Sequence, residues 1–200
     1  TDAYGGLVEN RKHRTDGTFQ TTGDAKENIL EITGGTVTNA YGAKVAVAAG
    51  NAEENSVKIT GGTINTSAYG ADLTAAAGTG TARKNKAEMT NGNIPGSLYG
   101  AHTAGSGTLT ESEVSVSGGT IGASVYGSDV AAGAGDATKS KIMLTGGAIT
   151  GDVYGGRAAG TGAATGHTLN LNGGTVGGSV YGGNATSGAA TGNTITLTGG

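Results

Sequence analysis

The stretch Gly173–Gly183, which reads GGTVGGSVYGG, decides the fold of this 200-residue chain. Weaker versions of this stretch recur along the chain, and each contains a tyrosine followed by glycine. These tyrosines lie 37, 28, 30, 27, 28 and 27 residues apart, at Tyr4, Tyr41, Tyr69, Tyr99, Tyr126, Tyr154 and Tyr181. A period of this length without a helical pattern indicates one supersecondary unit per repeat, with the units stacked on one another.

Two short strands are expected to flank the glycine pair of each repeat. Before the pair, apolar and polar residues alternate, as with Leu169 and Leu171 on either side of Asn170. This alternation is typical of a half-buried strand. After the pair, an apolar column contains Val37, Ile64, Ile94, Ile121, Ile149 and Val176. The residue before each tyrosine is small or aliphatic, so we expect it to point inward and the tyrosine to point outward.

The composition favours a thin solenoid over a compact globular core. The chain has 42 glycines and only one proline, one phenylalanine and no tryptophan. Cysteine is absent, which excludes disulfides and thiolate metal sites. The net charge of −3 argues against a nucleic-acid partner. The longest nearly apolar run, Val45–Ala49, is too short for membrane insertion. Because the chain starts at Thr1 and ends within a repeat, we expect a segment of a longer chain.

Equivalent residues of successive coils should lie directly above one another, ~4.8 Å apart. One such column, six residues before the glycine-pair position, holds Asn28, Asn55, Asn85, Ser112, Ser140, His167 and Asn193. Another, three residues after tyrosine, holds Lys44, Asp72, His102, Asp129, Arg157 and Asn184. In the same way Lys84 and Lys86 should lie over Glu111 and Glu113, and these over Lys139 and Lys141. Alternating charges of this kind penalise a slipped register.

The tyrosine column is the first candidate binding site. An outward row of rings could contact glycan rings or an apolar strip of another protein. Alternatively, the rings stack on one another and shield the glycine-rich backbone, and both roles are compatible. The candidate binding edge consists of Tyr41, Tyr69, Tyr99, Tyr126, Tyr154 and Tyr181.

The second candidate site is an insertion within residues 7–27, in the first coil. About ten extra residues separate Tyr4 from Tyr41, and insertions in solenoids form loops on one face, which is often the binding face. The alternative is a solvated loop without a ligand. The candidate contacts in this insertion are Arg11, Lys12, His13 and Arg14.

The repeat resembles a known architecture. Its asparagine column at one turn, Gly-Gly pairs at another and aliphatic columns inside resemble the right-handed parallel β-helix. The GGTxxxSVYGG pattern more narrowly resembles repeats in passenger domains of bacterial autotransporter-type surface proteins and adhesins. The resemblance implies an all-β, right-handed parallel β-helix (β-solenoid) of about seven coils, most with 27 or 28 residues, forming a single domain over residues 1–200.

The same resemblance implies a function. It predicts an extracellular location at the bacterial cell surface and a role as an adhesin or stalk. The expected partner is a host or bacterial surface protein or a glycan. An alternative is a self-assembling fibre subunit whose open ends associate head to tail, because unpaired strand edges favour such pairing.

Catalysis is the least favoured interpretation. Some β-helices cleave polysaccharides with carboxylates that converge on one groove, but Asp72 and Asp129 are separated here by His102. Only Asp152 lies near a glycine-rich turn as a calcium repeat would require, and the three histidines share no metal-binding spacing. We therefore expect no enzyme activity, no cofactor and no metal.

Overall fold

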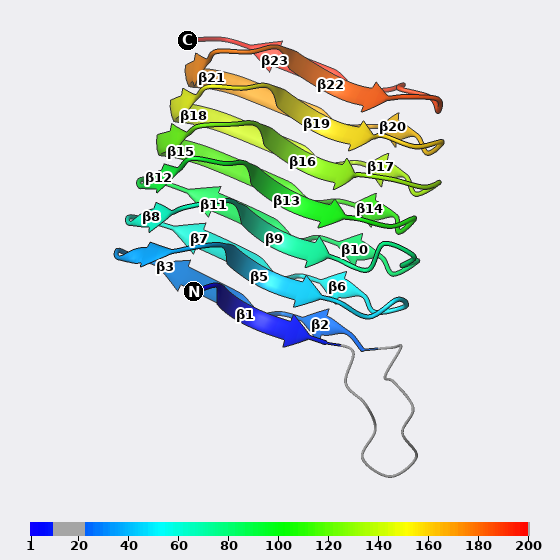
Figure 1. Ribbon diagram of the computed structural model, residues 1–200. Helices are drawn as coiled ribbons and strands as arrows, with labels where there is room; N and C mark the ends of the chain where they lie inside the picture. The colour runs from blue at the N-terminus through cyan, green and yellow to red at the C-terminus, as the bar shows by residue number, and fades with distance from the viewer. Residues whose placement is uncertain (10–22, 200) are drawn as a thin grey trace.

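The computed structural model describes residues 1–9 and 23–199. It shows a parallel β-solenoid, with no helix in the described ranges (Figure 1). Each strand pairs in parallel with equivalent strands of adjacent coils, so three sheets run along the solenoid axis. The predicted all-β solenoid is therefore confirmed.

The first sheet, which we call the tyrosine sheet, contains all seven tyrosines. Its strands are β1 (Ala3–Val8), β5 (Ala40–Val45), β9 (Ala68–Leu73), β13 (Leu98–Thr103), β16 (Val125–Val130), β19 (Val153–Ala158) and β22 (Val180–Ala185). The pairing places Tyr4 beside Tyr41 and Tyr41 beside Tyr69, as the repeat predicted. Seven strands in this sheet correspond to about six turns, close to the seven coils expected.

The second sheet has six strands of two residues each. They are β2 (Ala25–Lys26), β6 (Ala52–Glu53), β10 (Ala82–Arg83), β14 (Leu109–Thr110), β17 (Ala137–Thr138) and β20 (Ala164–Thr165). The first residue of each strand is apolar, and those of β6 to β20 are almost completely buried. We call this the six-stranded sheet.

The third sheet has ten strands and includes both sides of the glycine pair. Its main strands are β3 (Ile29–Ile32), β7 (Ser56–Ile59), β11 (Lys86–Met89), β15 (Glu113–Ile121), β18 (Lys141–Ile149), β21 (Thr168–Val176) and β23 (Thr194–Leu197). Three short strands complete it: β4 (Thr36–Val37), β8 (Thr63–Ile64) and β12 (Asn93–Ile94). In each of β15, β18 and β21, the strands expected before and after the glycine pair join into one strand of nine residues.

The core consists of two apolar clusters. The larger cluster contains the predicted aliphatic columns, including Val57, Ile142 and Leu169 from the ten-stranded sheet. The smaller cluster is rich in alanine, including Ala43 and Ala52, and packs the tyrosine sheet against the six-stranded sheet. Small side chains fit there because the two sheets approach closely.

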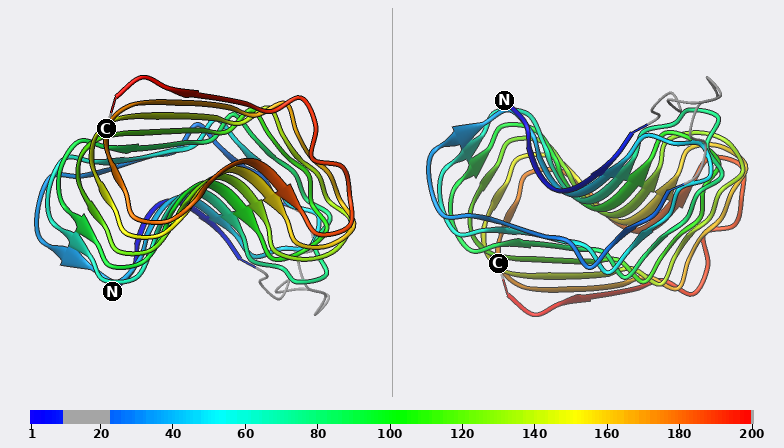
Figure 2. Two further views of the ribbon diagram at one scale, coloured as in Figure 1. Left: turned by 90° about the horizontal axis from the view of Figure 1, so that it is seen from above. Right: turned by 90° about the horizontal axis from the view of Figure 1, so that it is seen from below.

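The tyrosine sheet bends inward, so the solenoid is concave on this side when viewed along its axis (Figure 2). The glycine after tyrosine permits the bend. A Cβ atom on Gly70 would lie 2.7 Å from the Lys86 backbone oxygen in the ten-stranded sheet. Side chains are therefore excluded where the two backbones approach. The glycine pairs have a different role: the second glycine, as at Gly174 (φ 80°), adopts a turn conformation that favours glycine.

Candidate functional site: the tyrosine sheet and its charged column

The tyrosine rings form one continuous stack on the outer, concave face of the solenoid. Neighbouring ring centroids are 4.7–5.1 Å apart, and neighbouring ring planes differ by 2–8°. The preceding residue points inward, since Ala40 and Val153 are fully buried in the core. The predicted orientation of the tyrosines is therefore confirmed.

Stacking limits how this column can contact a ligand. Each inner ring has both faces covered by its neighbours, and Tyr41 and Tyr126 are only 5% and 8% exposed. The terminal rings, Tyr4 and Tyr181, remain 37% and 36% exposed. A glycan ring could stack on a terminal face, whereas the inner tyrosines of the predicted binding edge offer only their ring edges.

A column of charged side chains runs beside the rings. The Nδ1 atom of His102 lies 2.7 Å from Oδ1 of Asp72, and its Nε2 atom lies 3.9 Å from Oδ2 of Asp129. Arg157 donates two hydrogen bonds to Asp129, of 2.7 and 2.9 Å. The predicted alternation of charge is confirmed. Asp72 and Asp129 are both buried, so solvent has little access to either carboxylate.

The charged column and the rings also contact each other. Lys44 places its Nζ atom 4.8 Å from the centre of the Tyr41 ring, and the Arg157 guanidinium lies 5.0 Å from the centre of the Tyr126 ring. His102 contacts the rings of Tyr69 and Tyr99 edge-on. Such cation–π contacts add stabilisation and cover part of the ring surface.

The electrostatic environment shifts several pKa values. Burial lowers the pKa of His102, but the hydrogen bond to Asp72 and the charge of Asp129 outweigh this effect, so the pKa is raised overall. Burial raises the pKa of Tyr99 to about 12. Burial, together with the bond to Asp152, raises the pKa of Tyr154 to about 12. These phenols therefore stay protonated at neutral pH.

Two tyrosine hydroxyl groups donate to carboxylates two residues earlier in the chain. Tyr4 donates to Asp2 over 3.0 Å, and Tyr154 donates to Asp152 over 2.8 Å. Asp152, the residue weighed as a calcium ligand, also accepts the Ser179 backbone N–H. Its pKa is lowered by these two bonds. Within the described part of the chain, no three His, Asp or Glu side chains gather closely enough to hold a metal ion.

The predicted asparagine column forms buried hydrogen bonds between coils on both sides of Ser112, whose own buried hydroxyl has no partner among the described residues. Asn28 donates to the Asn55 side-chain oxygen over 2.8 Å, and Asn55 donates to that of Asn85 over 2.9 Å. His167 continues the column: its Nδ1 atom accepts the Ser140 backbone N–H. Burial lowers the pKa of His167 to about 4, so its ring is neutral. In these bonds the acceptor lies on the later coil.

A second ladder, which sequence reasoning missed, lies two residues before tyrosine. Each side chain accepts the backbone N–H of its counterpart on the following coil. The column contains Asp2, Asn39, Ser67, Ser97, Ser124, Asp152 and Ser179. The signal was the recurrence of Asp, Asn and Ser at this position, residues whose short side chains bond nearby backbone groups.

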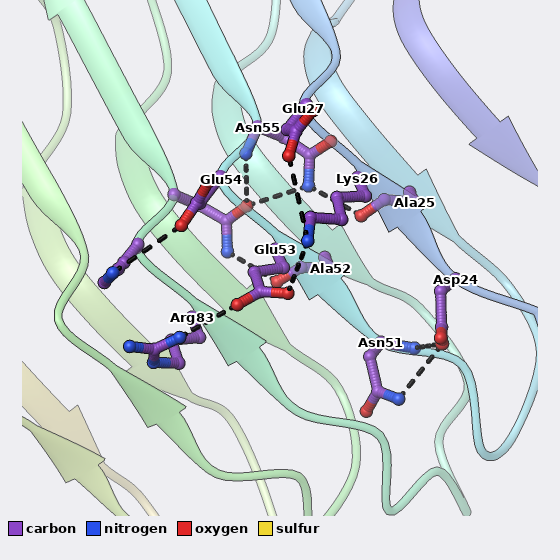
Figure 3. Close-up of polar contacts among 12 residues, drawn as sticks. Asp24, Ala25, Lys26, Glu27, Asn51, Ala52, Glu53, Glu54, Asn55 and Arg83 are labelled. Atoms are coloured by element: carbon purple, nitrogen blue, oxygen red, sulfur yellow. Dashed lines mark hydrogen bonds and ion pairs between the residues drawn. The ribbon is translucent and has the colours of Figure 1, made fainter.

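A third ladder was also missed and lies just before the six-stranded sheet. Asp24 accepts both the backbone and side-chain N–H groups of Asn51 (Figure 3). Asn51 in turn accepts the backbone N–H of Thr81. Beside it, Glu53 contacts Lys26 at 3.5 Å and Arg83 at 2.8 Å. Polar side chains therefore join coils at all three corners.

The predicted lysine and glutamate columns are confirmed. Strand pairing places Lys86 beside Glu113 and Glu113 beside Lys141. The six side chains of the two columns line a surface hollow of about 510 Å³: Lys84, Lys86, Glu111, Glu113, Lys139 and Lys141. Three of these residues also adopt a positive φ that the sequence analysis did not anticipate: Lys84, Glu111 and Lys139. The sequence did contain a sign of this conformation, because glycine occupies the position of Lys139 in the next two coils, at Gly166 and Gly192.

The proposed insertion contacts Arg11, Lys12, His13 and Arg14 lie outside the described residues. Of the segment 7–27, the structure places the end of β1 and all of β2. The described ranges contain no apolar helix of membrane-spanning length.

No protein-family model, no curated protein and no solved structure matches this chain.

Proposed function

We propose that this chain is a structural and adhesive segment of a bacterial cell-surface β-helical protein, an autotransporter-like adhesin or stalk that extends from the cell and mediates attachment. The observation that carries this proposal is the bonding between coils, in which three parallel sheets and three side-chain ladders follow the same axis. Each coil adds ~4.8 Å of length. A solenoid of this build suits a spacer that holds a binding site away from a surface.

The stalk role can be tested by removing whole coils. Deleting residues 99–153 joins Leu98 to Tyr154, preserves the tyrosine register and places Arg157 beside Asp72. The shortened chain should lose ~10 Å of length, two coils, in small-angle X-ray scattering. Displayed on bacteria with a terminal peptide tag, it should bind bulky antibody-coated beads less well than the full chain. Unchanged bead binding would count against a spacer role.

The adhesive role needs a separate measurement. Beads coated with the chain should bind epithelial cells or components of a glycan array, and albumin-coated beads should not. Replacing Arg11, Lys12, His13 and Arg14 together by alanine should reduce binding if the insertion supplies the contacts. Replacing Tyr181 by alanine tests the accessible end of the predicted tyrosine edge. No binding by the unmodified chain would leave the stalk role without an adhesive one.

The proposed role is non-enzymatic. Asp72 and Asp129, the carboxylates weighed for polysaccharide cleavage, are buried and bonded to His102 and Arg157. This arrangement favours a structural role for both. Release of unsaturated uronides from pectate, abolished by Asp129→Asn, would contradict the proposal.

A second candidate function is an end-to-end fibre subunit, favoured by the distribution of exposed apolar side chains. Among the described residues, six of the seven large exposed hydrophobic side chains lie on the first or last coil: Tyr4, Leu7, Ile29, Tyr181, Ile195 and Leu197. The last coils also open into an apolar hollow of about 500 Å³. No Asp, Glu, Lys or Arg follows Arg157, so charges do not protect this edge.

Light scattering and electron microscopy can test the fibre candidate. The unmodified chain should form filaments whose number rises with concentration, and Leu197→Lys should abolish them. Met143→Lys is the matched control, because Met143 is exposed on a middle coil. A chain that stays monomeric at all concentrations would exclude the fibre function and leave the stalk proposal standing.

A further inference from the structure

The tyrosine stack connects two accessible rings through a shielded interior. Six consecutive ring contacts of 4.7–5.1 Å lead from Tyr4 on the first coil to Tyr181 on the last. Within the stack Tyr41 and Tyr126 are buried, whereas both terminal rings are about one-third exposed. The π systems of all seven residues are therefore in contact along one line.

The same stack contains the side chains that most readily lose a single electron. The sequence has no tryptophan and no cysteine, and the ring of its one phenylalanine is much harder to oxidise than a phenol. Methionine is oxidised mainly by gain of an oxygen atom; of the two methionines, Met89 is fully buried and Met143 is exposed on a middle coil. A one-electron oxidant should therefore leave its electron hole on the tyrosines.

Oxidation of a phenol also requires a place for its proton. In the column two residues before tyrosine, only Asp2 and Asp152 are carboxylates. Both accept a phenol hydrogen bond, from Tyr4 and Tyr154 respectively. The two sites lie on the first coil and on the second-last strand of the tyrosine sheet.

We propose that the tyrosine stack conducts one-electron oxidation along the solenoid and that the electron hole comes to rest at Tyr4 and Tyr154. The oxidant belongs to the class of one-electron acceptors, such as a ruthenium(III) polypyridyl complex. This activity is independent of the adhesive or stalk role.

The reaction is balanced in electrons and protons. The oxidant gains one electron from a phenol and is reduced, which leaves a positive hole on the ring. Electron exchange between stacked rings moves the hole. At Tyr4 the O–H bond breaks, the proton passes to the Asp2 carboxylate, and a neutral phenoxyl radical remains. The carboxylic acid then returns its proton to water.

The absence of cysteine allows an oxidant to be placed at one end of the stack. Asn184→Cys introduces a thiol three residues after Tyr181, the spacing at which Lys44 reaches the Tyr41 ring. A ruthenium tris-bipyridine complex attached there is converted to ruthenium(III) by a light flash and a cobalt(III) quencher. A nitroso spin trap then captures phenoxyl radicals, and peptide mass spectrometry measures adducts on each tyrosine.

With this label we expect adducts on Tyr4, at the opposite end of the molecule, in a yield that does not depend on protein concentration. Combining Tyr99→Phe with Tyr126→Phe keeps the stacked rings but removes two neighbouring phenol groups from the middle of the column. Tyr4 adducts should then fall to the level of unlabelled protein, while Tyr154 adducts persist. Asp2→Asn should reduce adducts on Tyr4 but not those on Tyr154.

The matched control places the label on the other side of the interruption. With Lys44→Cys carrying the complex, the two phenylalanines should not lower the Tyr4 yield. Circular dichroism verifies that the variants fold, and Tyr99→Phe alone serves if the double variant does not. Equal Tyr4 yields from the distant label with and without the phenylalanines would overturn the proposal. The proposal would also be overturned if Tyr4 adducts formed with the label at position 44 but not with the label at position 184.

Discussion

Arg157 and Asp129 form a bidentate ion pair across adjacent coils, with Nε to Oδ1 at 2.7 Å and Nη2 to Oδ2 at 2.9 Å. The Asp129 side chain is only 1% exposed, so the guanidinium provides most of what solvation by water would provide. A buried carboxylate that loses such a partner is strongly destabilising.

Arg157→Ala is therefore expected to lower the free energy of unfolding by about 1–3 kcal/mol. Arg157→Lys should recover only part of the loss, because an ammonium group cannot form the two-pronged contact. Urea denaturation followed by circular dichroism measures both effects. Arg83→Ala is the control: its partner Glu53 is about one-third exposed, and we expect a loss of only about 0.2–1 kcal/mol. Equal losses would mean that burial of the pair has no effect.

Stability should depend on pH through His102. Burial and the positive charge of Arg157 lower the pKa of this residue in the folded chain. The hydrogen bond to Asp72 and the negative charges of Asp72 and Asp129 raise it by more, so the pKa is raised overall. A raised pKa means that protonation favours the folded state. The stabilisation should be complete below about pH 6.5, the ordinary histidine value, and should fade as pH rises through the higher folded value.

Thermal unfolding measured from pH 6 to pH 9 should therefore show a falling midpoint that His102→Gln removes. Tyr69 and Tyr99 also face His102, but burial raises the pKa of each, so they do not titrate in this window. A slope that survives in His102→Gln would assign the pH dependence to another group.

Gly156 and His167 should behave as a coupled pair. A Cβ atom on Gly156 would meet the His167 ring, and the equivalent glycines Gly6 and Gly183 similarly face Asn28 and Asn193. Gly156→Ala is expected to destabilise by about 1–3 kcal/mol, the usual cost of overpacking. Adding His167→Ser should recover much of this loss in a double-mutant cycle. On the preceding coil the equivalent of His167 is Ser140, and it already lies opposite Ser128, which is larger than glycine. Additive effects would show that the two sites do not contact.

Lys139→Gly should stabilise the protein. Lys139 has a φ of 54°, which disfavours residues with a Cβ atom, and Gly166 occupies this position on the next coil with a φ of 72°. We expect a gain of about 0.5–1 kcal/mol after allowing for the flexibility of glycine in the unfolded chain. The reverse change, Gly166→Lys, should lower the midpoint of chemical denaturation. A loss of stability in Lys139→Gly would show that the Lys139 side chain matters more than its backbone conformation.

The sequence predicted the solenoid because its columns recur in every coil, even where an insertion separates Tyr4 from Tyr41. The spacing from Tyr99 to Tyr126 sets the strand pairing, and the alternation of Lys86, Glu113 and Lys141 excludes a shifted register. The burial of Tyr41 and Tyr126 could not be predicted in this way. It depends on the inward bend of their sheet, which arises from contact between backbones that are distant in the sequence.

The missed ladders have a different explanation. Asp2 and Ser67 share little as side chains, so their column is hard to recognise as one set. What they share is an oxygen that accepts a backbone N–H from the following coil. The positive φ of Lys84 was hidden for a related reason, since a charged residue occupies a position where glycine would be expected.

The ladders have opposite polarity, and this has a consequence for the electrostatics of the whole array. The asparagine column donates toward later coils, as from Asn28 to Asn55, whereas the column that begins at Asp2 donates toward earlier ones. Chains of hydrogen bonds polarise along their length. The column that begins at Asp24 also donates toward earlier coils. The asparagine column therefore opposes the dipole moments of the other two columns, so the side-chain ladders do not all add to one axial dipole of the kind that builds up in a long α-helix.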